Sequence, residues 1–105
     1  MLELSRAKVA QVVLFSHERG RGDPELVAFI DGLNDDEKAA LVAVMWIGRG
    51  SFEPDEFEDA FRMAQQEATT PTSEYLMGTP HFGDHLEAGM ELLGIDVSEA
   101  EEELL

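Results

Sequence analysis

Apolar residues recur every three or four positions along most of the chain, which is the spacing of one face of an α-helix. No segment shows the strict alternation of apolar and polar residues expected of a half-buried strand. The pattern predicts helices over residues of about 4–17, 24–33 and 35–48, a fourth from Pro54 to about Ala68, a short fifth from Thr70–Pro71, and a sixth between Pro80 and Gly94.

Residues just before these segments are typical of helix N-termini. Asp23 and Asn34 carry side-chain oxygens that can accept hydrogen bonds from the first free amides of a helix. Glu37 follows Asn34 by three positions, which is the spacing of a capping box. Thr79 is expected to cap the sixth helix in the same way, ahead of Pro80.

The segment Ala39–Ile47 is apolar on all sides, so we expect it to form the central and most deeply buried helix. Gly48 and Gly50 are expected to end this helix. The sequence therefore predicts an all-α fold. It would be a single compact domain over residues 1–95, with five to six short helices packed around the central one. Residues 96–105 would add an acidic tail or a short helix.

The charge of the chain is strongly one-sided. It has 105 residues, no cysteine and a formal net charge of −16, and residues 63–105 hold ten acids and no Lys or Arg. The absence of cysteine excludes a disulfide scaffold and any cysteine-ligated metal site. An acidic surface repels nucleic acid and anionic membranes, so we expect neither as a partner. Two interpretations of the acidity remain: a solvated surface, or a surface that meets a basic protein.

The longest apolar run, Ala39–Ile47, has nine residues, whereas a membrane-spanning helix needs about 20. The first residues mix charges and do not resemble a secretory signal. We expect a soluble, cytoplasmic protein.

Residues 50–56 resemble the second half of an EF-hand calcium loop, with a glycine, a central apolar residue and a glutamate at the expected spacing. The earlier positions that would supply oxygen ligands hold Met45, Ile47 and Arg49. Two apolar side chains and a cation cannot coordinate calcium, so the segment is expected only to connect two helices.

His81 and His85 are four residues apart and share a helix face, and Asp84 lies three residues after His81. This spacing suits metal ligands and resembles the H-x-x-E-H pattern of metalloproteases, with aspartate in place of glutamate. Glu74 and His17 are the candidates for a third protein ligand. The alternative is a pair of half-exposed histidines without a catalytic role.

Trp46, Arg49 and Tyr75 are the candidates for an interaction site. A tryptophan followed one turn later by an arginine at a helix end suits a recognition site on a protein surface. The alternative is that Trp46 is a core residue and that Arg49 caps the last carbonyl groups of its helix or pairs with an acid.

Three blocks of sequence carry a resemblance to a known family: residues 41–50, which end in Trp-Ile-Gly-Arg-Gly, residues 75–80, which read Tyr-Leu-Met-Gly-Thr-Pro, and residues 84–90. With these blocks the chain resembles DUF3775, a small bacterial family of unknown function, over about residues 24–95. The resemblance implies a helical fold and no known activity.

These observations favour a non-catalytic protein–protein interaction module that binds a partner protein or a second copy of itself and needs no cofactor. No serine has the context of an activated nucleophile, and no catalytic residue is assigned. Two alternatives stay open. One is a small metal-dependent hydrolase built on the His-x-x-Asp-His helix. The other is a nucleic-acid mimic that blocks a DNA-binding protein.

Overall fold

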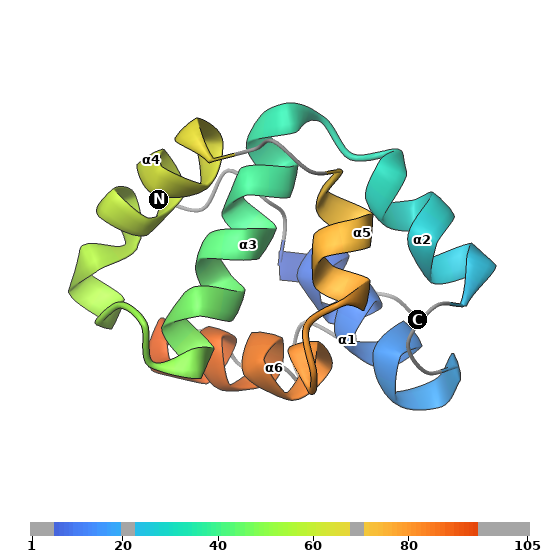
Figure 1. Ribbon diagram of the computed structural model, residues 1–105. Helices are drawn as coiled ribbons and strands as arrows, with labels where there is room; N and C mark the ends of the chain where they lie inside the picture. The colour runs from blue at the N-terminus through green and yellow to red at the C-terminus, as the bar shows by residue number, and fades with distance from the viewer. Residues whose placement is uncertain (1–5, 20–22, 68–70, 95–105) are drawn as a thin grey trace.

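The computed structural model describes residues 6–19, 23–67 and 71–94, and within these ranges it contains six α-helices, one 3₁₀ turn and no strand (Figure 1). The predicted all-α fold is confirmed. None of the described helices is both long and apolar enough to cross a membrane. The elements are α1 (Arg6–Arg19), α2 (Pro24–Asp31), α3 (Asp35–Arg49), η1 (Pro54–Glu56), α4 (Phe57–Gln66), α5 (Thr72–Met77) and α6 (Phe82–Leu92).

The apolar segment 39–47 forms the middle of α3, and all nine of its residues are buried. In Figure 1, α3 stands between α4 and α5 while α6 runs across its C-terminal end. The prediction of a central helix over about residues 35–48 is therefore confirmed. The predicted tail, residues 96–105, lies outside the described residues, so the proposed division of the chain stays a prediction.

The N-terminal caps follow the sequence signals. The Asp23 carboxylate accepts hydrogen bonds from the amides of Glu25 and Leu26, at 3.1 and 3.2 Å. Asn34 accepts from the amide of Glu37 at 2.8 Å, and Glu37 accepts from the amide of Asn34 at 3.0 Å. Both predictions are confirmed, because a cap depends only on residues within one helical turn.

The predicted cap at Thr79 is wrong. Its hydroxyl donates to the carbonyl oxygen of Tyr75, at 2.9 Å. Thr79 follows Tyr75 by four residues, which brings it over a carbonyl group in the last turn of α5 that has no partner within the helix. The next helix, α6, begins only at Phe82, after His81 in a left-handed conformation with a φ of 59°.

The connection between α3 and α4 also differs in detail from the predicted one. Pro54 begins the 3₁₀ turn η1, and α4 itself begins at Phe57. The Glu56 carboxylate, which would be the bidentate ligand of an EF-hand, accepts a hydrogen bond from the amide of Glu53 at 2.7 Å. It therefore closes the turn locally, which agrees with a helix connection.

The backbones of α3 and α6 lie almost in contact where the helices cross. A Cβ atom at Gly48 would lie 1.7 Å from the carbonyl oxygen of His85, and one at Gly89 would lie 2.1 Å from that of Val44. Only glycine fits at either position. Of the two glycines expected to end the third helix, Gly50 does so as its C-terminal cap, with a φ of 90°, whereas Gly48 lies inside α3, which ends at Arg49.

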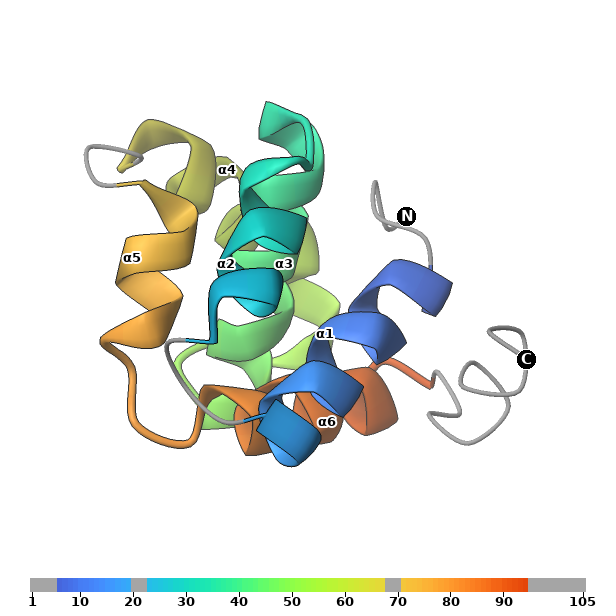
Figure 2. The same cartoon turned by 90° about the vertical axis from the view of Figure 1, so that its right-hand side faces the viewer.

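Helix α1 packs against α6 and α2 through the fully buried side chains of Val9, Val12 and Val13 (Figure 2). An ion pair between Lys8 of α1 and Glu37 of α3 adds a polar link. The hydrogen bond from Lys8, followed by the one from the Asn34 amide, lowers the pKa of Glu37 below its ordinary value. The first helix is thus held to the rest by apolar packing and by this charge pair.

Candidate functional site

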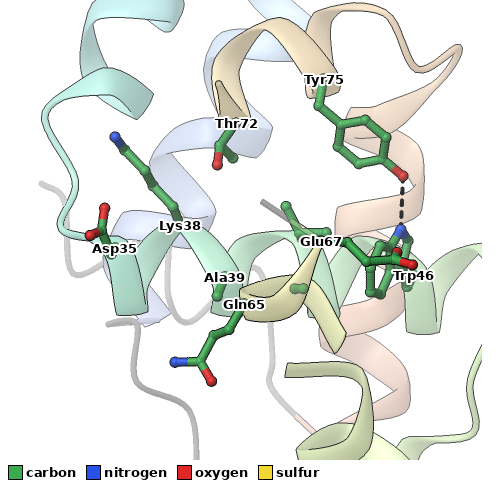
Figure 3. Close-up of a pocket in the computed structure, with 10 residues that line it drawn as sticks. Asp35, Lys38, Ala39, Trp46, Gln65, Glu67, Thr72 and Tyr75 are labelled. Carbon is green, nitrogen blue, oxygen red and sulfur yellow. Dashed lines mark hydrogen bonds between the residues drawn. The ribbon is translucent and has the colours of Figure 1, made fainter. Parts of the chain in front are cut away.

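One face of α3 is not completely covered by its neighbours. Six of the nine residues in segment 39–47 have no solvent-exposed surface, whereas Ala39, Val42 and Trp46 each retain 7%. These three residues are three and four positions apart, so they form a single strip along the helix. The strip faces a groove that lies between α4 and α5 (Figure 3).

The groove has a volume of about 540 Å³. Two of its lining side chains are short, because Ala39 on α3 and Ala64 on α4 both stop at Cβ. The lining residues are Asp35, Lys38, Ala39, Val42 and Trp46 from α3, Ala64, Gln65 and Glu67 from α4 and the residue after it, and Thr72 and Tyr75 from α5.

The two ends of the groove differ in character. Figure 3 shows Asp35 and Lys38 at one end and the aromatic pair Trp46 and Tyr75 at the other, with the carboxylate of Glu67 beside Trp46. At the aromatic end the indole Nε1–H of Trp46 donates to the hydroxyl oxygen of Tyr75, at 2.9 Å. The Trp46 ring also stacks on Phe52, with ring centroids 5.8 Å apart and planes inclined by 23°. Stacking and hydrogen bonding together fix the orientation of the indole.

The structure brings together two of the three predicted interaction residues. Trp46 and Tyr75 share the groove, and Trp46 is at the same time a buried part of the core. Arg49 is exposed and does not line the groove, and its Nε donates to the hydroxyl of Ser51 at 3.1 Å. Their role in binding stays a prediction.

A second and smaller hollow, of about 280 Å³, lies where the end of α1 meets the start of α6. Here the Asp84 carboxylate lies between two imidazoles, 3.7 Å from Nε2 of His17 and 3.7 Å from Nδ1 of His81. All three side chains are substantially exposed, at 46–77%. These are long contacts at the surface, so their contribution to stability is small.

The structure pairs Asp84 with His17, and His85 does not line this hollow. No group of three or more His, Asp and Glu side chains among the described residues is arranged to hold one metal ion. The metal site built on His81, Asp84 and His85 stays a prediction without geometric support.

Sequence reasoning missed most of the groove, including Lys38, Ala39, Val42, Ala64 and Glu67. One signal was present: the central helix is apolar on every face, including the face that neither α4 nor α5 covers. Which face stays open depends on tertiary packing, and the sequence pattern of one helix does not contain that information.

A family model described as a protein of unknown function (DUF3775) matches residues 23–95. No curated protein and no solved structure matches the chain. All the residues that line the groove lie within the matched range, whereas α1, with His17, precedes it.

Proposed function

We propose that this chain, which belongs to the DUF3775 family of unknown function, is a non-catalytic binding module that holds a segment of a partner protein in the groove between α4 and α5. The family carries no assigned activity. The observation that supports the proposal is the strip of Ala39, Val42 and Trp46, an apolar surface on the central helix that lines the groove and in which each residue retains 7% exposure.

The dimensions of the groove suit a short stretch of polypeptide. From Asp35 to Trp46 the groove follows eleven residue steps of α3, which at a rise of 1.5 Å is a length of roughly 16 Å. An extended peptide of about five residues has the same length. Recognition of linear segments in apolar grooves beside helices is a recurrent mode of protein binding.

The side chains in the groove favour binding over catalysis. The hydrogen bond between lining side chains in Figure 3 joins Trp46 to Tyr75, and an indole N–H is neither a nucleophile nor a general base. No histidine is among the described residues that line the groove, and the chain has no cysteine. Among the described lining residues, the hydroxyls of Thr72 and Tyr75 and the amine of Lys38 form no hydrogen bond to a lining carboxylate, so none is paired with a base as in covalent catalysis.

A photo-crosslinking experiment in the cells of origin tests the proposal. The crosslinking residue p-benzoylphenylalanine replaces Thr72 in the groove or, as a control, Glu58 on the exposed face of α4. We expect a crosslink to another protein from position 72 and not from position 58. The crosslink should disappear when Ala39→Leu fills the groove and persist with Ala28→Leu on the exposed side of α2.

Ala64→Leu fills the groove from the opposite wall and serves as a second blocking variant, and thermal unfolding identifies any variant that fails to fold. A crosslinking pattern that both blocking variants leave unchanged while folded would contradict the proposal. A crosslink only to a second copy of the chain would also contradict it, because the occupant would then be the chain itself.

A further inference from the structure

We infer that the segment held in the groove is an extended, basic peptide that places an apolar side chain at the Trp46 end and Lys or Arg side chains beside the acids of the rim. This inference rests on the proposed function and adds the chemistry of the partner. It is carried by three features of the groove: its charged rim, its apolar walls and the hydroxyl of Tyr75.

The acids of the groove's rim are Asp35 and Glu67, and neither forms an ion pair with another described residue. Two acids in the first turn of α3 have partners, since Asp36 accepts a hydrogen bond from Gln65 and Glu37 pairs with Lys8. Asp35 and Glu67 both line the groove, both are exposed, and neither has a side-chain partner among the described residues.

Among the described residues that line the groove, Lys38 is the single cation against two acids, in a chain whose net charge is −16. The local charge and the overall charge therefore have the same sign. Both would attract a cationic segment and repel an anionic one, and such steering raises the association rate of the correct partner.

The apolar walls of the groove favour an apolar side chain in the bound peptide. Val42 and Trp46 on α3 and Ala64 on α4 present carbon atoms to the groove, so an apolar side chain entering there would remove its own surface and theirs from water. A partly exposed tryptophan held rigid by stacking and a hydrogen bond is a common centre of binding energy in interfaces.

The Tyr75 hydroxyl offers a hydrogen bond to the backbone of the peptide. Its oxygen accepts from Trp46, and its own proton has no acceptor among the described residues. A hydroxyl that already accepts one bond is well placed to donate another, and a peptide carbonyl is the matching acceptor. An extended peptide segment presents such a carbonyl at every residue, whereas an isolated side chain does not present a series of backbone carbonyls.

Selection from a phage-displayed library of random linear peptides tests the inference with the full chain. Peptides that bind the wild type and not Ala39→Leu should be enriched in Lys and Arg flanking an apolar residue. Synthetic copies should change the fluorescence of Trp46, which is the single tryptophan of the chain and a wall of the groove. Enrichment of acidic or uncharged peptides would overturn the inference.

Two matched variants locate the charge. Glu67→Gln, on the rim, should weaken binding of a selected peptide by about two- to fivefold at low salt, the range for an exposed charge pair. Glu58→Gln, with the same change of charge on the outer face of α4, should leave the affinity unchanged. Equal weakening by both variants would mean general attraction to an acidic surface and would overturn the inference.

The two experiments together distinguish failure of this inference from failure of the proposed function. If no peptide binds in a groove-dependent way while the crosslink from position 72 persists, the partner presents a folded surface and the peptide chemistry is wrong. If groove-dependent peptides bind and no crosslink forms in cells, the chemistry of the groove stands and the proposed cellular role fails.

Discussion

Trp46 contributes to the core and to the groove at the same time. It is 7% exposed, its ring stacks on Phe52 and its indole donates to Tyr75, so most of its contacts are with the protein itself. The exposed remainder faces the groove. Because Trp46 has both roles, loss of stability and loss of binding must be measured separately for any substitution of this residue.

Trp46→Ala should lower the free energy of unfolding by about 3–5 kcal/mol, because it removes a large buried aromatic side chain. Urea unfolding followed by circular dichroism measures the loss. Tyr75→Phe is the companion variant: it keeps the ring, removes the acceptor for the indole, and should lower stability by only about 0.5–1.5 kcal/mol. A loss below about 1 kcal/mol for Trp46→Ala would mean that the indole is not part of the core.

The crossing of α3 and α6 determines how the central helix is placed. Gly48 and Gly89 let the two backbones meet, and this contact sets the position of α3 relative to α6. On another face of α3 lies the groove, where the short side chains of Ala39 on α3 and Ala64 on α4 line the space beside α5. Both features depend on which side chains are short, at Gly48, Gly89, Ala39 and Ala64.

Gly89→Ala should destabilise the domain by about 1–3 kcal/mol or more, because the added Cβ would lie 2.1 Å from a backbone carbonyl that cannot rotate away. Gly32→Ala is the control: its φ of −80° suits any residue, and the nearest atom to its Cβ would be 3.5 Å away. Thermal unfolding of the two variants gives the comparison. Equal melting temperatures would contradict the close approach of α3 and α6.

The contribution of the ion pair between α1 and α3 to the stability of the fold should depend on pH. The pKa of Glu37 lies below its ordinary value of 4.5, chiefly because of the hydrogen bond from Lys8. A carboxyl group with a lowered pKa in the folded state stabilises the fold above its ordinary pKa, and this contribution is lost as the pH falls through the folded value.

Glu37→Gln should therefore melt below the wild type near neutral pH, and the gap should narrow in acid below 4.5. The comparison uses melting temperatures of the two proteins across this range. Lys8→Met removes the other partner and should show the same trend. A gap that stays constant with pH would show that the ion pair does not contribute.

Over the whole molecule, the sequence predicts what is local and leaves open what is long-range. The helices and the caps at Asp23 and Asn34 were predictable, because each depends on residues within a turn or two. The hydrogen bond between Trp46 and Tyr75 joins residues 29 positions apart, and no periodicity indicates it. Gly48 was expected to end a helix because the sequence does not show that α6 packs against it. Its role is to let the backbones of α3 and α6 approach, which is a long-range contact.

The acidic surface and the groove together determine what this molecule is expected to bind. A net charge of −16 would attract a basic partner but does not define a site, whereas the proposed site in the groove has apolar walls and an aromatic end. Charge alone would act over the whole surface and weaken uniformly with salt. A specific module should instead bind at one place.

The claim that the chain binds its partner in the groove is tested most directly by nitrogen–proton correlation NMR. The labelled full chain is titrated with a peptide selected on the groove. The indole N–H of Trp46 gives a single, recognisable signal, because the chain has one tryptophan. We predict that this signal and the amides of Ala39, Val42, Thr72 and Tyr75 shift on binding, and that none shifts in Ala39→Leu. Shifts confined to the hollow around His17, His81 and Asp84, or spread evenly over the acidic surface, would contradict a binding site in the groove.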